Sequence, residues 1–255
     1  MEVTPLPIPA LLIIENQMIT IQVMESSTKS DGPPTDSLLR NLSETILGYK
    51  KELPVLAGID GVDASGKTTL ADKLASHLEK SGRQIIRASI DGFHNPSSIR
   101  YRQGRESPEG YYRDSFNHEL ILEKLLEPLS AGNLKFKEKV FDYRMDKEIN
   151  TQEQKAEKDA ILIMDGIFLF RPELIHYWDI KIFLDAGFDV IIQRAIKRAK
   201  DRKDSDSEQE IIDLYNRRYI PGQKLYFQEA YPQEKADILI DNNDYNNPFI
   251  VRTVF

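Results

Sequence analysis

An eight-residue segment, Gly61 to Thr68, constrains the fold of this chain more than any other part of its sequence. It reads Gly-Val-Asp-Ala-Ser-Gly-Lys-Thr and fits the pattern Gly-x4-Gly-Lys-Ser/Thr at every fixed position. A short apolar run, Val55 to Ile59, precedes it, and leucines recur every fourth residue from Leu70 to Leu78 after it. A buried strand, a tight turn and an amphipathic helix are therefore predicted in succession. This context predicts a phosphate loop that binds a nucleoside triphosphate.

The residue types of the loop explain how it would hold phosphate. Glycines let several backbone N–H groups point at one phosphate, and the helix N-terminus adds a partial positive charge. Lys67 is expected to act catalytically on the β- and γ-phosphates of ATP, and the Thr68 hydroxyl to ligate Mg²⁺. The predicted ATP-binding residues are Gly61, Asp63, Ala64, Ser65, Gly66, Lys67, Thr68 and Thr69. The alternative is a chance match, which four fixed positions in the right context disfavour.

Composition narrows the partners that such a site could serve. The chain has 34 Lys plus Arg and 41 Asp plus Glu, a net charge of −7, which argues against nucleic acid as a partner. It has no cysteine, which excludes disulfides, thiolate metal sites and cysteine nucleophiles. No apolar run approaches the roughly 20 residues of a membrane span, and no basic residue precedes Ala10–Ile14 as in a secretory signal. We therefore expect a cytoplasmic protein without a membrane partner.

Strand and helix patterns alternate along the rest of the chain. Buried or edge strands are predicted at Val55–Ile59, Gln84–Ile90, Lys135–Phe141 (the edge strand), Ile161–Met164, Ile180–Leu184 and Ala236–Ile240. Helices are predicted after Asp36 as N-cap, over Leu70–Leu78, around Leu120–Leu126, over Asp189–Arg202 and over Glu208–Tyr219. This alternation predicts an α/β fold of the P-loop NTPase type, with a mostly parallel sheet flanked by helices.

The N-terminal segment differs from the remainder. Pro5, Pro7 and Pro9 alternate, and residues 26–35 are rich in Ser, Gly and Pro, so residues 1–35 are predicted to be a flexible or poorly packed extension. An alternative is an upstream start codon, with the chain beginning at Met18 or Met24. Residues 36–255 are predicted to form a single kinase-type P-loop domain.

Two carboxylates follow predicted strands, at the sheet edge where ligands bind in open parallel sheets. Asp91 follows the second strand and Asp165 follows the strand Ile161–Met164. Beside a phosphate loop, Asp165 is expected to hold Mg²⁺, and Asp91 to act as general base for a substrate hydroxyl. The alternative for each is a turn or capping residue. Asp60 and Asp63, next to the loop, are expected to have local structural roles first, and the position of His94 favours the substrate pocket.

Together these motifs resemble the uridine kinase-like branch of P-loop kinases, a group that includes phosphoribulokinase and bacterial pantothenate kinase. The resemblance covers about Leu53 to Asn243. It rests on the phosphate loop, Asp91-Gly92-Phe93-His94, Ser107–Phe116, Phe141-Asp142-Tyr143, Asp165-Gly166-Ile167-Phe168, the arginines of the helix over Asp189–Arg202, and Ala236–Ile240.

The resemblance implies ATP- and Mg²⁺-dependent phosphorylation of a hydroxyl on a small metabolite, first of all the 5′-hydroxyl of uridine or cytidine. Pantothenate or a sugar-type alcohol is the alternative acceptor. A non-catalytic, nucleotide-binding regulatory protein is the alternative from another class, although a switch needs no base at Asp91. The sequence does not distinguish a monomer from a homo-oligomer.

The resemblance also assigns roles at matching positions. Asp91 falls on the catalytic base, Asp114 on an acid that contacts ribose hydroxyls, and Arg194 and Arg198 on a lid helix as catalytic cations. A solvated helix face is the alternative for the two arginines. The predicted substrate-binding residues are Asp91, Phe93, His94, Tyr112, Asp114, Phe141 and Arg194.

Three positions depart from the uridine kinase pattern. His94 stands where uridine kinases carry Tyr, Asp165 stands where they carry Glu, and Asp146 occupies the position nearest to their pyrimidine-reading His. Asp-Gly-Phe and the following Pro96 are closer to pantothenate kinases. The motifs therefore predict phosphoryl transfer more firmly than pyrimidine recognition.

Overall fold

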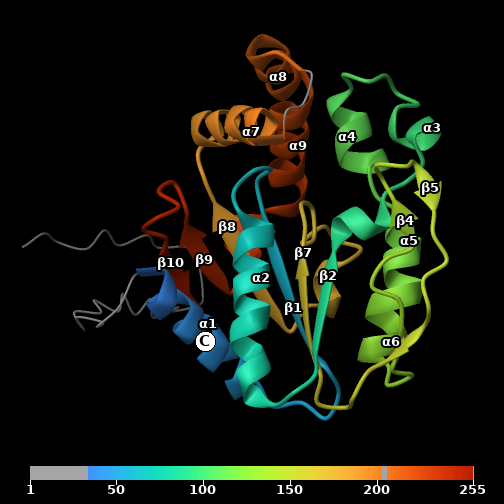
Figure 1. Ribbon diagram of the computed structural model, residues 1–255, viewed down its shortest axis with the longest axis vertical. Coiled ribbons are helices and arrows are strands. Elements are labelled where there is room, and N and C mark those ends of the chain that lie inside the picture. The colour runs from blue at the N-terminus through green and yellow to red at the C-terminus, as the bar shows by residue number, and fades with distance from the viewer. Residues whose placement is uncertain (1–33, 203–205, 255) are drawn as a thin grey trace, which may run out of the picture.

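A six-stranded sheet forms the centre of the computed structural model, which describes residues 34–202 and 206–254 (Figure 1). Its strands are β1 (Val55–Gly61), β2 (Ile85–Ser89), β7 (Ile161–Asp165), β8 (Ile180–Asp185), β9 (Ile238–Asp241) and β10 (Phe249–Thr253). Their order is β10-β9-β8-β1-β7-β2, and every pair is parallel except β9 with β10. The predicted α/β fold with a mostly parallel sheet is confirmed. The carboxyl ends of β1, β2 and β7 lie side by side and position the site.

Side chains of the central strands enter two separate cores because successive strand residues point to opposite faces. Strand β1 is buried along its whole length. Its Val55, Ala57 and Ile59 join one apolar cluster, whereas Leu56 joins the other. Burying each such aliphatic side chain stabilises the fold by about 2 kcal/mol. This explains why β1 reads as a continuous apolar run.

Helices cover both faces of the sheet. On one face lie α1 (Pro34–Gly48) and α2 (Lys67–Leu78), whose apolar stripes pack against each other and the strands. The other face is covered by α4 (Pro108–Asp114), by α5 (His118–Ile121), η3 (Leu122–Leu126) and α6 (Glu127–Ser130) in succession, and by part of α9 (Ile220–Ala230). After α2, a 3-10 turn, η1 (Glu79–Ser81), leads to Gly82 at φ 78°, the predicted end of this helix.

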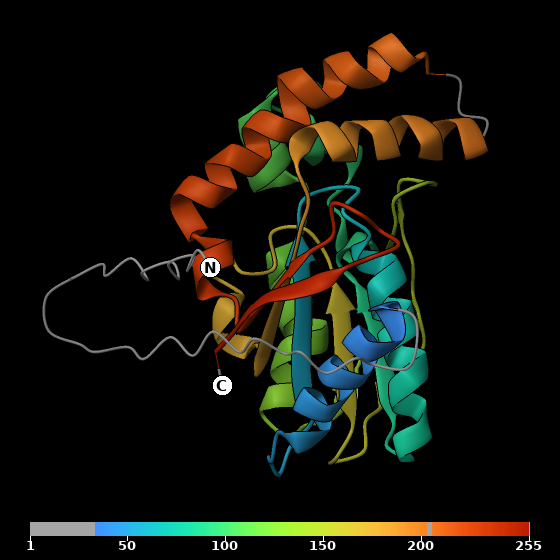
Figure 2. The same cartoon turned by 90° about the vertical axis from the view of Figure 1, so that its left-hand side faces the viewer.

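A helical lid lies across the carboxyl ends of the strands (Figure 2). It consists of α7 (Phe188–Arg202) and of α8 (Glu208–Leu214), which continues through the π-helical η5 (Tyr215–Tyr219) into α9. A capping box at Ser207 and Glu210 starts α8, because the serine oxygen accepts from the Glu210 N–H while the glutamate reaches back. Both helices predicted here are confirmed, and the second extends to Ala230.

The remaining elements are short. They are η2 (Ile90–Phe93), α3 (Ser97–Arg100), β3 (Lys135–Phe136), β4 (Phe141–Asp142), β5 (Lys147–Glu148), β6 (Gln154–Lys155), η4 (Ile175–Tyr177) and α10 (Pro232–Lys235).

Two predictions about these elements are wrong, and one strand was not predicted. Residues 135–141 form no edge strand of the main sheet, because Lys135–Phe136 pairs with β6 and Phe141–Asp142 pairs with β5. The edge strands are β2 and β10, and the sequence analysis missed β10 because its sequence, Phe-Ile-Val-Arg-Thr, shows no alternation of apolar and polar residues. Asp36 is not an N-cap, because α1 already begins at Pro34, whose fixed φ suits a first helical position.

Almost all of the predicted N-terminal extension, residues 1–35, lies outside the described residues, so its flexibility stays a prediction. The single domain over residues 36–255 likewise stays a prediction. Pro34 and Thr35 already belong to α1. Within the part of the chain that the structure describes, no helix is long and apolar enough to cross a membrane.

Candidate active site

The phosphate loop connects β1 to α2 and turns on residues with unusual backbone conformations. Gly61 has φ 155° and Gly66 has φ 99°, values that side chains with a Cβ rarely adopt. A Cβ at Gly61 would collide with the Leu184 carbonyl oxygen, and one at Gly66 would lie 3.0 Å from Asn242 Nδ2. The loop is therefore wedged between β8 and the segment after β9. Both glycines are required by space as well as by backbone conformation.

Asn242, which the sequence analysis did not single out, fixes the loop from the side. Its Nδ2 donates to the Ser65 carbonyl at 2.6 Å, and its own backbone N–H donates to the Asp185 carbonyl at 2.8 Å. Ser65 is fully buried, and its hydroxyl oxygen has no hydrogen-bond partner among the described residues. A buried unpartnered hydroxyl beside a ring of backbone N–H groups fits a loop built to hold phosphate.

Lys67 carries a buried charge at the centre of the loop. Its Nζ donates to the Val62 carbonyl at 2.6 Å, and the residue is 9% exposed. Burial lowers the pKa of Lys67, and the negative charges of Asp63, Asp60 and Asp165, with a smaller contribution from Asp91, counteract this only in part. The Lys67 ammonium group therefore interacts with four carboxylates. The negative charge of a bound triphosphate would further favour the protonated form of Lys67.

Asp60 has the local structural role that we expected for it. This buried carboxylate accepts from the N–H groups of Gly61, at 2.6 Å, and Phe170, at 3.0 Å, and from the Tyr226 hydroxyl. Burial raises the pKa of Asp60 to about 6, although these hydrogen bonds and Lys67 act in the opposite direction. It ties the end of β1 to the segment after β7 and to α9.

Thr68 and Asp165, the two predicted Mg²⁺ ligands, lie together. The Thr68 hydroxyl donates to Asp165 Oδ2 at 2.6 Å, although the residues are 97 positions apart. Asp165 Oδ1 accepts from Arg87 Nη2 at 2.7 Å, and the aspartate is 2% exposed. A hydroxyl and a carboxylate oxygen at the edge of a phosphate loop are suitable donors for Mg²⁺, which takes its other ligands from water and phosphate. No cluster of three or more metal-ligating side chains is found in residues 34–202 and 206–254.

Arg87 is a functional candidate that the sequence analysis missed. It lies in β2 and bridges two carboxylates, Asp165 through Nη2 and Asp72 through Nε at 2.9 Å. An arginine inside an otherwise apolar strand was the available signal, since a buried cation requires a partner. Arg87 therefore orients the carboxylate that faces Thr68.

We expect Asp165→Asn to raise the Mg²⁺ concentration needed for half-maximal activity by about tenfold or more, because an amide is a poorer ligand for a hard cation. A Mg²⁺ titration at saturating ATP measures this. The matched control is Asp72→Asn, which removes the other carboxylate of Arg87 but is 62% exposed. If the titration of Asp165→Asn coincided with that of the control, Asp165 would not be the metal-side acid.

Asp91 lies in η2, directly after β2, and its side chain is 61% exposed. His94 Nε2 lies 3.5 Å from Asp91 Oδ1, and His94 Nδ1 lies 3.0 Å from the Ser115 carbonyl. The imidazole is stacked on Phe116, with ring centroids 4.5 Å apart. Desolvation raises the pKa of Asp91, but His94, Lys67 and Arg198 outweigh it and lower the pKa overall. The carboxylate is therefore ionised, held by His94 and within electrostatic range of the loop lysine.

Arg198 joins the lid to the loop. Its Nη2 lies 3.8 Å from Asp63 Oδ2, an oxygen that also accepts from the Tyr215 hydroxyl. Burial lowers the pKa of Arg198, but nearby negative groups, Asp63 first and Asp91 among them, raise it overall. The Asp63 side chain thus contacts the lid, and only its position in the loop supports the ATP-binding role predicted for it.

Arg194 is held more tightly than predicted. Its Nη2 donates to the Asn242 carbonyl at 2.7 Å, and its Nη1 lies 3.3 Å from the Ser65 carbonyl. Burial lowers its pKa. These donors anchor the start of the lid to the phosphate loop and to the segment after β9, so the structure places Arg194 beside the loop. The solvated helix face considered for it is wrong.

Several predicted substrate contacts are core residues, which corrects the sequence-based assignment. Phe93, Tyr112 and Phe141 are 0%, 1% and 5% exposed, respectively. Phe93 and Tyr112 belong to the larger apolar core. In this geometry Phe93 and Tyr112 present almost no surface to a ligand and support the backbone around Asp91 and Asp114, whereas Phe141 keeps a small exposed area.

Asp114 is buried as well, and its carboxylate is fully engaged. Arg102 donates to both of its oxygens, with Nε 3.0 Å from Oδ2, and Gln103 Nε2 donates to Oδ2 at 2.7 Å. Asp114 is 3% exposed. The pKa of Asp114 is lowered, because these hydrogen bonds outweigh desolvation. The sequence could not show this clamp, which leaves Asp114 no free oxygen in the present geometry.

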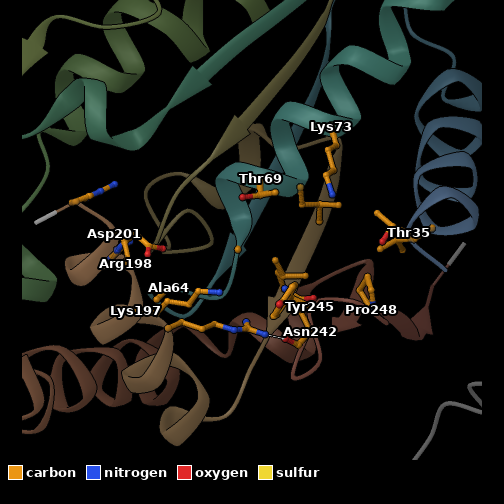
Figure 3. A pocket seen from close by; sticks show the side chains of 16 residues that line it. Thr35, Ala64, Thr69, Lys73, Lys197, Arg198, Asp201, Asn242, Tyr245 and Pro248 are labelled. Carbon is orange, nitrogen blue, oxygen red and sulfur yellow. Dashed lines mark hydrogen bonds between the residues drawn. The ribbon is translucent and has the colours of Figure 1, made fainter. Parts of the chain in front are cut away.

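A pocket of about 420 Å³ adjoins the loop, between α2, α7, α1 and the segment after β9 (Figure 3). Ala64, Gly66 and Thr69 form its inner end, and Arg194 and Arg198 line it from α7. Its volume lies within the range of small-molecule sites. The P-loop, Lys67, Asp165, Asp91 and Arg198 thus surround one region, with this pocket beside it.

Comparison with known proteins agrees with this geometry. The model of the phosphoribulokinase/uridine kinase family matches residues 56–245. The chain belongs to this family. The uridine kinase of Ligilactobacillus salivarius is 27% identical over 202 residues, 78% of this chain and 91% of that protein. The uridine kinase of Clostridium novyi is 31% identical over 199 residues, 76% of this chain and 89% of that protein.

A solved structure described as a possible uridine kinase from Bacillus stearothermophilus has the same fold. Its TM-score is 0.65 at 23% identity, over 80% of this chain and 97% of that one. As a member of the family, the chain is a phosphotransferase with an alcohol group as acceptor, and its fold is that of a nucleotide-binding kinase.

Proposed function

We propose that this chain transfers the γ-phosphate of ATP, with Mg²⁺, to a hydroxyl of a small metabolite. The observation that carries the proposal is that the phosphate loop with its buried Lys67, the hydrogen-bonded pair Thr68 and Asp165, and the carboxylate of Asp91 all lie at the carboxyl ends of β1, β7 and β2. A carboxylate beside this lysine and the proposed Mg²⁺ ligands can hold an acceptor hydroxyl against a triphosphate. A nucleotide switch would need no such carboxylate.

In this proposal each group has one task. The backbone of the loop and Lys67 hold the phosphates, while Thr68 and Asp165 hold Mg²⁺, which neutralises charge on the phosphate oxygens. Asp91 orients the acceptor hydroxyl and takes its proton, and Arg198 stabilises charge on the transferring phosphoryl group. The lowered pKa makes Asp91 a weak base. That suits a loose transition state, in which positioning contributes more than early proton removal.

Uridine or cytidine, phosphorylated at the 5′-hydroxyl, is the first proposed acceptor. The names of the two curated relatives support it. The same names support a small, nucleoside-sized acceptor.

A pantothenate-like acceptor, an alcohol that carries a carboxylate, is the second candidate, and specific contacts favour it. Asp114 is clamped by Arg102 and Gln103, and Asp146 is held by Arg100 and Ser97. Neither position is therefore free to recognise a neutral nucleoside. Arg105 and the buried Arg218 both lie against the Tyr101 ring, and Arg218 Nη1 donates to the Arg105 carbonyl; no ion pair with a carboxylate is found for either arginine among the described residues. This surplus of cations favours an anionic acceptor.

An ATP-consumption screen with Mg²⁺ tests both. Uridine, cytidine, other nucleosides, pantothenate and several sugars are added singly to the full chain. A strong response to uridine or cytidine supports the first candidate, and a response to pantothenate alone supports the second. ATP binding with slow hydrolysis that no acceptor accelerates would favour a regulatory nucleotide switch.

A further inference from the structure

The pocket beside the phosphate loop has a wall that the family's shared region does not supply. Its lining includes Thr35 and Leu38 of α1, and the family match begins only at residue 56. Pro248, just beyond the end of that match at residue 245, completes the same side. Figure 3 shows Thr35 and Pro248 at one end of the pocket, and Ala64, Arg198 and Asp201 toward the other.

The direction of the pocket indicates which part of a nucleotide would reach this wall. The triphosphate belongs at Lys67 and Thr68, and the pocket starts at the neighbouring Gly66 and Thr69 and runs along α2 past Leu70. A nucleotide with its triphosphate at Lys67 and Thr68 would therefore extend its ribose and base into this adjoining pocket. Asp91 does not line it, so this space does not serve the acceptor.

The lining of the pocket combines charged and apolar side chains. Cations from α7 and α2, namely Arg194, Lys197, Arg198, Arg202 and Lys73, line it along with Asp201. Leu38, Leu70, Pro248 and the ring of Tyr245 add apolar surface to the same pocket. The Tyr245 ring has Arg194 at 5.9 Å and Lys197 at 6.0 Å. A flat, largely apolar base suits such a wall better than a second charged group does.

Helix α1 is fixed in this position by the core. Leu42 and Ile46 are fully buried and pack in the same cluster as Leu70 and Leu74 of α2. Helix α1 also contacts α2 and β10 along its length. Its first turn therefore projects from a rigid support, and Thr35 and Leu38 need no rearrangement to face the pocket.

We propose that helix α1, although it precedes the family's shared region, is part of the donor-nucleotide site, where Thr35 and Leu38 hold the base of ATP. This inference rests on the proposed function, because it takes ATP as the phosphoryl donor. It assigns α1 to donor binding and not to the transfer step, so that α1 affects the affinity for ATP without touching the reacting atoms.

The test is calorimetric titration of the full chain with Mg²⁺ and two probes, ATP and inorganic tripolyphosphate. Thr35→Trp fills the end of the pocket at Thr35 and Pro248. We expect it to raise the Kd for ATP by about tenfold or more, and to leave the Kd for tripolyphosphate within about twofold, because tripolyphosphate has no base. The matched control is Arg40→Trp, an exposed residue of the same helix that does not line the pocket. It should leave both Kd values unchanged.

Each outcome decides the proposal. A change that affects ATP but not tripolyphosphate, even a gain through stacking of the indole, places residue 35 at the base and supports it. If the Kd of Thr35→Trp for ATP equals that of the control, or if its affinities for ATP and tripolyphosphate fall by the same factor, α1 does not line the base site. The proposed function would still stand. If the wild-type chain itself binds no ATP, the proposed function fails together with this inference.

Discussion

Replacing Lys67 by alanine should lower kcat by about 10³-fold or more, the largest effect that we expect from any single substitution, because the lysine stabilises charge that develops on the transferring phosphoryl group. Its Nζ lies inside the loop on the Val62 carbonyl, and it is the ammonium group that faces the carboxylates of Asp60, Asp63, Asp91 and Asp165. Initial rates at saturating ATP and acceptor measure the loss.

The stability of this variant separates catalysis from folding. Burial disfavours the charged form of Lys67, as its lowered pKa records, so its removal relieves a desolvation cost while it leaves the carboxylates less well compensated. We therefore expect a Tm close to that of the wild type. Lys80→Ala, an exposed lysine of the turn after α2, is the control and should retain full activity. Substantial turnover by a folded Lys67→Ala protein would contradict the role of this residue.

Asp91→Asn should lower kcat by about 10²-fold or more while the KM for ATP stays within about twofold, because an amide cannot accept the acceptor proton. Asp91 is exposed at the end of β2, so the substitution removes little packing. The Asn side chain can still lie near His94, which keeps the geometry while it removes the base. Steady-state kinetics with ATP varied at saturating acceptor distinguish the two parameters.

The control for this substitution is Asp189→Asn, an exposed aspartate in the first turn of α7. It changes the net charge by the same amount without touching the site. If Asp91→Asn turned over like Asp189→Asn, the carboxylate would not be the base. A large rise in the KM for ATP with kcat unchanged would instead place Asp91 in nucleotide binding.

Some of the site was predictable because it is encoded locally. The phosphate loop needs glycines, a lysine and a hydroxyl at fixed spacing, and Asp91 and Asp165 directly follow strands whose apolar runs are plain in the sequence. Parallel strands bring their carboxyl ends to one edge, so the proximity of Asp165 to Thr68 follows from topology. The roles of the aromatic residues were harder to predict, because the sequence does not distinguish an aromatic side chain that lines a site from one that supports the site from the core.

What the sequence by itself determined is thus the α/β fold, the phosphate loop and the strand-end carboxylates, since these depend on local pattern and on the rule that parallel strands align. Only the tertiary structure decided which partners those groups have. Arg87 orients Asp165, Arg102 and Gln103 clamp Asp114, and Asn242 fixes the loop from a segment 177 residues away. It likewise decided that α1 lines the pocket beside the phosphate loop. The physical reason is that hydrogen bonds and contacts between distant segments depend on packing in three dimensions, and spacing along the chain does not record it.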